Sequence, residues 1–166
     1  MSAEPQTDIV SARAVRESPL GNELSDTQCR ALAAVASAIC LDQGMLLLEQ
    51  GHVDDTLYIV ISGSLEVFRE SGGGETVTLQ MLHDGDMAGL LGFIDGAAHS
   101  AGIRAARPSE LIALSRGDLE SLLASDPGLV YEVMRALVRA AHRIVGQMNT
   151  QFVEMSNYIN RQHGRY

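Results

Sequence analysis

Short apolar runs separated by glycines, between residues 40 and 116, constrain the fold more than any other feature of this chain. The best defined run is residues 57–61, Leu-Tyr-Ile-Val-Ile, which is rich in β-branched and aromatic side chains and is followed by Gly63. Many short strands joined by turns are typical of a sandwich or a roll, and sharp turns often need the positive φ that glycine adopts at little cost. We therefore predict an α+β protein with a jelly-roll-like β-roll over residues 24–125.

Residues 85–105, GDMAGLLGFIDGAAHSAGIRA, form the second informative stretch. Gly85 and Asp86 predict a turn, and Gly89 begins a brief helical turn. Free backbone amides at such a start favour a phosphate or a carboxylate. The stretch therefore indicates an anion-binding segment, followed by a returning strand over residues 100–105.

These two stretches together resemble the cyclic-nucleotide-binding domains of bacterial catabolite activator proteins, kinase regulatory subunits and gated channels. The first signature is residues 47–51, Leu-Leu-Glu-Gln-Gly, with Asp54, the strand at 57–60 and Gly63 at the family's spacing. The second is Gly85-Asp86 directly before the segment that in this family is the phosphate-binding cassette. The resemblance covers about residues 24–145 and implies the β-roll of that family.

The cassette departs from the family pattern at its two charged ligands. The family has Gly-Glu where this chain has Gly89-Leu90, and Arg-Ser-Ala where it has His99-Ser100-Ala101. In the family the glutamate binds the ribose hydroxyl and the arginine binds the cyclic phosphate, whereas leucine accepts no hydrogen bond and histidine is mostly neutral at pH 7. Because each charged hydrogen bond contributes about 1.5–3 kcal/mol, losing both predicts binding weaker by about a hundredfold to ten-thousandfold. The residues expected at this degenerate site are Gly89, Leu90, Leu91, His99, Ser100 and Ala101, above an apolar floor of Leu79, Leu91 and Ile103.

Two further positions bear on nucleotide binding. Arg104 shares a strand face with Ser100 by alternation and could replace the missing arginine, although a solvated surface side chain is the simpler interpretation. The resemblance implies that two hydroxyl residues on the long helix contact adenine, and an ungapped count places Ile144 and Val145 there. We expect ordinary cyclic AMP binding to be lost. The alternative is that some cyclic nucleotide still binds.

The regions that flank the roll are predicted to be helical or mobile. Residues 1–23 are polar without a sustained period and indicate a mobile arm, with at most one short helix near residues 9–15. Ser25 and Gln28 form a capping-box pattern at the start of an N-terminal helix. A long C-terminal helix is predicted over residues 126–160, followed by a tail at 161–166.

Apolar residues on the predicted long helix recur in steps of three, four and four, which keeps one stripe on one face. A helix of this length extends about 50 Å, and the roll covers only part of it. A parallel second copy is the simplest partner, and the family also dimerises through this helix. The predicted interface is Leu137, Ala141, Ile144, Met148 and Phe152.

Composition and charge exclude several partners. A net charge of −9 argues against a nucleic-acid surface and against an anionic membrane. The bacterial activators continue into a helix-turn-helix domain after the long helix, whereas this sequence ends at Tyr166, so DNA binding by the chain alone is not expected. Arg135, Arg139 and Arg143 indicate a solvated helix face. Without a signal peptide or an apolar run of about 20 residues, the chain is expected to be cytoplasmic.

No pattern for catalysis or for a metal site is present. Two cysteines are too few for a zinc or iron–sulfur site, and the histidines lack the His-x-His pair of a metal-binding cupin. We predict a protein that is not an enzyme and that needs no metal or cofactor. It would be a stand-alone regulatory module that docks on another signalling protein. The alternatives are a sensor that binds a cyclic nucleotide or cyclic dinucleotide in a rebuilt pocket, and haem sensing through His52 or His83.

Overall fold

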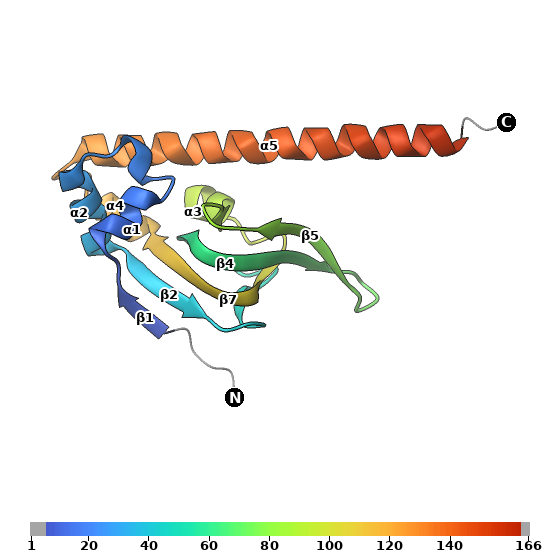
Figure 1. The fold of residues 1–166 in the computed structure, drawn as a ribbon, viewed down its shortest axis with the longest axis horizontal. Coiled ribbons are helices and arrows are strands. Elements are labelled where there is room, and N and C mark those ends of the chain that lie inside the picture. The colour runs from blue at the N-terminus through green and yellow to red at the C-terminus, as the bar shows by residue number, and fades with distance from the viewer. Residues whose placement is uncertain (1–5, 164–166) are drawn as a thin grey trace.

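The computed structural model describes residues 6–163 (Figure 1). A curved sheet lies along one side of a long helix, and the short helices gather near the start of that helix. In chain order the elements are β1 Gln6–Ile9, α1 Ala12–Glu17, the 3₁₀ turn η1 Gly21–Glu23, α2 Asp26–Val35, β2 Ser37–Leu41, β3 Leu46–Leu48, β4 Thr56–Glu70, β5 Thr76–Leu82, β6 Met87–Ala88, α3 Leu90–Asp95, β7 Gly102–Ser115, α4 Arg116–Ser121 and α5 Pro127–His163.

The sheet is built around two long antiparallel strands, β4 and β7. They pair from Thr56 opposite Ser115 to Phe68 opposite Gly102, with register shifts that bend both strands. The strand order is β1-β2-β7-β4-β5, while β3 pairs with β7 and β6 pairs with β4. This confirms the predicted β-roll flanked by N-terminal helices and a long C-terminal helix.

The apolar core has two parts, one on each side of this sheet. The first lies between the sheet and the helices and includes Leu32, Leu129 and Val133, all almost fully buried. The second lies inside the roll and includes Leu65 and Leu111. Full burial of such a side chain contributes about 1.5–3 kcal/mol, so the first set holds the helices against the sheet and the second stabilises the roll itself.

The capping box at the start of α2 is confirmed. The Ser25 hydroxyl accepts a hydrogen bond from the Gln28 amide N at 3.2 Å, and the Gln28 side chain accepts one from the Ser25 amide at 3.0 Å. These bonds satisfy two of the amides that a helix start leaves free.

The N-terminal segment differs from the predicted mobile arm. Over residues 6–23 the chain forms β1, α1 and η1, and β1 pairs with β2. Val15 and Leu20 are only 1% and 3% exposed, and Arg16 donates to the Gly21 carbonyl at 3.1 Å. The prediction was wrong here because these apolar residues show no local period, although α1 packs on η1 and α2 and its apolar side chains join the core between the sheet and the helices. Residues 1–5 lie outside the described part of the chain.

Helix α5 has a first half with one face buried in the core and an exposed second half. It begins at Pro127, where the Asp126 carboxylate accepts a hydrogen bond from the Leu129 amide at 2.8 Å. Its 37 residues correspond to about 55 Å, and it extends beyond the first half that packs on the core (Figure 1). The helix continues to His163, three residues past the predicted end at 160, and the rest of the predicted tail lies outside the described residues. No helix within residues 6–163 is long and apolar enough to cross a membrane.

Candidate functional site

The cassette is a short helix between two glycines with left-handed backbone. Gly89, with φ of 75°, follows β6 directly and begins α3, and Gly96, with φ of 70°, ends it. The loop from 97 to 101 then leads into β7, and the amide of His99 donates to the His52 carbonyl at 2.9 Å. The predicted turn, helix and returning strand are therefore all present in the order that the sequence indicated.

Gly89 is expected to tolerate no side chain. A Cβ at this position would lie 2.5 Å from the Thr56 carbonyl oxygen, and the positive φ already disfavours L-residues. Gly89→Ala should lower the free energy of unfolding by about 3 kcal/mol, measured by urea denaturation. Gly74→Ala is the matched control, because Gly74 has φ of 80° with no atom within 4 Å of the added Cβ, and it should cost only about 1 kcal/mol. Equal costs for both would show that the contact with Thr56 is unimportant.

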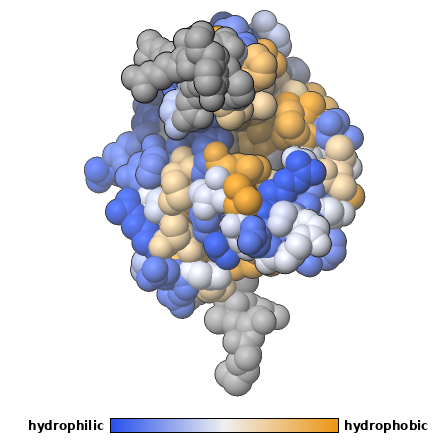
Figure 2. Space-filling model, turned by 90° about the vertical axis from the view of Figure 1, so that its right-hand side faces the viewer, coloured by the Kyte–Doolittle hydropathy of each residue, from blue (hydrophilic) through white to orange (hydrophobic). Residues whose placement is uncertain are grey.

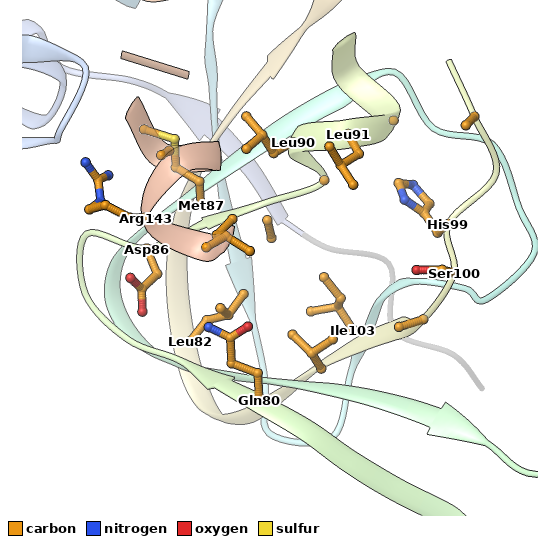
Figure 3. A pocket seen from close by; sticks show the side chains of 18 of the residues that line it. Gln80, Leu82, Asp86, Met87, Leu90, Leu91, His99, Ser100, Ile103 and Arg143 are labelled. Carbon is orange, nitrogen blue, oxygen red and sulfur yellow. The ribbon is translucent and has the colours of Figure 1, made fainter. Parts of the chain in front are cut away.

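A cavity of about 320 Å³ lies between the cassette, the inner face of β4 and β5, and α5 (Figure 3). All six residues predicted for the cassette site line it. The sheet contributes Val67, Gln80, Leu82 and Ile103, and α5 contributes Ala140, Arg143, Ile144 and Gln147. The structure thus brings the cassette and the long helix together around one space.

The two leucines of the cassette have different surroundings. Leu90 is 5% exposed and belongs to the core between the sheet and the helices, although it also borders the cavity. Leu91 is 69% exposed at the cavity's edge. The position at which the family has its glutamate is therefore filled by an apolar side chain that packs inward.

His99 and Ser100 line the opposite side of the cavity from α5 (Figure 3). The His99 Nε2 atom is buried and has no hydrogen-bond partner in the described part of the chain. The Ser100 residue is exposed, and its hydroxyl points toward the cavity. Both residues are therefore available to a ligand as hydrogen-bonding groups.

The expectation that Leu79 lies in the cavity floor is wrong, and the alternative role considered for Arg104 is not observed. Leu79 is 51% exposed and does not line the cavity, whereas its neighbour Gln80 does. Leu65 pairs with Leu82 and Val67 pairs with Gln80, so Gln80 and Leu82 share the inner face of the roll and alternation excludes Leu79 from it. Arg104 does not replace the missing arginine, because its side chain lies outside the cavity and binds Glu66 on the other face of the sheet.

Arg104 forms part of a cross-strand cluster outside the cavity. Its Nε atom donates to the Glu66 carboxylate at 2.7 Å, and its guanidinium lies 4.6 Å from the centre of the Phe68 ring. The Thr78 hydroxyl also donates to Glu66. The hydrogen bonds from Arg104 and then from Thr78 hold the pKa of Glu66 below its ordinary value.

This lowered pKa predicts a pH-dependent contribution of Glu66 to stability. Because the folded state favours the carboxylate, the contribution is present above the unfolded pKa near 4.5 and is lost as the pH falls through the lower, folded pKa. Glu66→Gln should therefore cost about 1 kcal/mol at pH 7, and this difference from wild type should shrink at pH 3.5 in urea denaturation. Glu75→Gln, in the exposed hairpin, should have almost no effect at either pH. A Glu66→Gln difference that stays constant between the two pH values would contradict the assignment.

Three residues that line the cavity were not predicted from the sequence, namely Gln80, Arg143 and Gln147. No local pattern marks them, because the surfaces that enclose the cavity with them come from other parts of the chain. Of the two helix positions that the ungapped alignment with the family placed near the base, Ile144 lines the cavity. Val145 is 55% exposed on α5 and does not line it. Neither of the residues considered for haem, His52 and His83, lines the cavity.

The second half of α5 carries exposed apolar side chains. Met148 and Phe152 are 62% and 69% exposed, while Ala141 and Ile144 are partly buried against their own chain. Figure 2 looks at this end of the molecule and shows hydrophobic surface between the end of the helix and the roll. Leu137 was predicted to lie at the dimer interface, but it is fully buried in the core of its own chain.

Comparison with known proteins identifies the class to which this fold and cavity belong. The model of the cyclic nucleotide-binding domain matches residues 39–126, so the chain belongs to this family. The cyclic AMP receptor protein of Thermus thermophilus is 33% identical over 97 residues, which cover 58% of this chain and 45% of that protein. This chain thus spans less than half of that relative's length.

Solved structures give the same fold. A cyclic nucleotide-binding domain from Methylobacillus flagellatus KT has a TM-score of 0.77 at 23% identity, with 87% of this chain and 81% of that chain covered. The N-terminal domain of a transcriptional regulator from Streptomyces coelicolor A3(2) has a TM-score of 0.68 at 29% identity, with 81% and 94% covered. The named relatives therefore include regulators that contain a domain of this type.

Proposed function

We propose that this chain is a regulatory module whose cavity does not bind cyclic AMP in the usual way of its family and which acts through contacts with other proteins rather than by catalysis. The observation that carries this proposal is Leu90, which packs into the core with 5% exposure at the position of the family's ribose-binding glutamate. His99 supports it, because a histidine in place of the phosphate-binding arginine removes a permanent positive charge. A cyclic phosphate buried there would lack its charged partner, which is costly.

Calorimetry with cyclic AMP tests this proposal directly. We expect a dissociation constant weaker than about 10 μM for the purified wild-type protein. Saturable binding tighter than that value would contradict it. The same titration with cyclic GMP extends the test to a second cyclic nucleotide.

The protein contacts are proposed to involve the exposed part of α5. A parallel second copy would cover Met148 and Phe152, with Ala141 and Ile144 at the edge of the contact. Such a dimer would present the roll for docking on another signalling protein in the cytoplasm. The net charge of −9 supports a protein partner over DNA or an anionic membrane.

A second candidate function is a small-molecule sensor with a rebuilt pocket. It is favoured by the cavity of about 320 Å³, which remains open between the cassette and α5. A volume of this size is within the range of small-ligand sites. Because α5 forms one wall, a ligand in the cavity would contact the same helix that carries the proposed dimer interface.

A further inference from the structure

The charge around the cavity is unfavourable for an anion. Of the described residues that line it, Asp86 and Asp95 are acidic and Arg143 is the single arginine. All three are exposed, and Figure 3 shows the side chain of Arg143 on α5, on the side opposite His99. The carboxylates of Asp86 and Asp95 each accept a hydrogen bond of 2.8 Å, from the backbone amides of His83 and Ala97 respectively. An anionic ligand would therefore meet more negative than positive charge, in a chain whose net charge is −9.

Neutral polar groups, in contrast, face the cavity from two sides. The Gln80 amide extends from β5, and the Ser100 hydroxyl points inward from the cassette loop (Figure 3). Neither side chain takes part in a hydrogen bond within residues 6–163, and the His99 Nε2 atom beside Ser100 is buried without a partner. Because buried polar atoms are normally paired, the His99 Nε2 atom is placed to be satisfied by a bound molecule. The more accessible side chains of Gln80 and Ser100 can pair with the same molecule.

The remainder of the lining is apolar. Between the two polar sides, the cavity is lined by apolar side chains from both core clusters and from α5, namely Leu82, Met87, Leu90, Ile103 and Ile144. Such surface favours a ligand with an apolar or aromatic body, because burial of that body removes nonpolar area from water.

We propose that the cavity binds an uncharged organic molecule with a ring-sized apolar body and hydrogen-bonding groups at two ends. One end pairs with the Gln80 amide, and the other pairs with Ser100 and His99. This inference rests on the second candidate function above, and it assigns to that site a ligand class that differs from cyclic nucleotides in charge. An uncharged ligand needs no counter-charge, so the absence of an arginine beside Ser100 is no disadvantage to it.

Matched pairs of neutral and anionic probes test the proposal. The full chain is titrated with adenosine and with cyclic AMP, which share base and ribose, and with a set of aromatic carboxamides and the corresponding carboxylates. Binding is followed by ligand-detected NMR and by the shifts of the His99 ring protons. We expect the neutral member to bind at least tenfold more tightly in the pairs that bind. Tighter binding of the anionic members, or binding of no neutral member, overturns the proposal.

Three variants, with a fourth as control, locate the bound molecule. Gln80→Leu should weaken the best neutral probe at least fivefold, and Arg143→Gln should change its affinity less than twofold. Thr76→Val, at an exposed position of the same strand, is the control and should change nothing. A loss of binding in Arg143→Gln, with Gln80→Leu unchanged, overturns the proposal in favour of an anion site. Ser100→Ala gives an independent readout from the other side of the cavity, with an expected loss of at least threefold.

The outcomes also separate this inference from the proposed function. Tight binding of cyclic AMP by the wild-type protein contradicts the proposed function. Failure of every neutral probe contradicts only the further inference, because a module that docks on other proteins requires no ligand.

Discussion

Met148→Asp is expected to convert a dimer with twice the 17.8 kDa chain mass into a monomer. Met148 lies at the centre of the apolar stripe of α5 and is 62% exposed in the single chain. In a parallel pair of helices the two aspartates would face each other in an apolar contact, where burial of unpaired like charges costs several kcal/mol. Size-exclusion chromatography with light scattering at micromolar concentration measures the mass of both proteins.

Two control variants separate loss of the interface from loss of the fold. Thr150→Asp adds the same charge two residues further on, about 200° around the helix and away from the stripe, so the mass should stay that of the dimer. Leu137→Ala removes a side chain that is fully buried in its own chain, and it should lower the free energy of unfolding by about 2–5 kcal/mol without a change in mass. A wild-type protein that is monomeric, or a Met148→Asp protein that keeps the dimer mass, would show that α5 does not pair in this way.

The double substitution Leu90→Glu with His99→Arg should create cyclic AMP binding at least a hundredfold tighter than that of the wild type. It restores the two charged side chains of the family pattern on a backbone that already has the cassette geometry, with Gly89 and Gly96 in the left-handed region. Each restored charged hydrogen bond contributes about 1.5–3 kcal/mol, which supports a combined gain of a hundredfold to ten-thousandfold. Calorimetry with cyclic AMP measures the gain.

The single variants are the controls for this gain. His99→Arg alone should recover only the phosphate contact, and Leu90→Glu alone should lose apolar packing, so its thermal unfolding must be measured beside the affinity. A folded double variant that remains unable to bind cyclic AMP would mean that the two side chains do not explain the expected loss. The apolar side chain of Ile144, which lines the cavity from α5, would then be the next position to exchange.

The sequence was sufficient wherever the structure depends on local chemistry. Glycines between apolar runs predicted the turns of the roll, and Ser25 with Gln28 predicted the start of α2, because turn conformation and helix capping involve residues close in the chain. The three-four-four spacing predicted a long helix with one apolar face for the same reason. The positions of the cassette and of the cavity residues His99 and Ser100 also followed from sequence, through the family pattern.

The tertiary structure decided which partner each side chain has. The sequence placed Arg104 on the correct strand. Only the pairing of β4 with β7 showed that its side chain binds Glu66 and stacks on Phe68. Alternation along β5 defines two faces, and only the register with β4, which pairs Val67 with Gln80, showed that the face of Gln80 and not that of Leu79 is the inner one.

The same limit applies to the two ends of the chain. Residues 6–23 were predicted to be a mobile arm because their few apolar side chains form no period, yet Val15 and Leu20 are buried in the core that the helices form with the sheet. On α5 the sequence shows one continuous apolar stripe, and only the folded chain shows that Leu137 belongs to its own core while Met148 remains exposed. Periodicity reports that a face is apolar, but what covers the face depends on long-range packing, which local sequence does not encode.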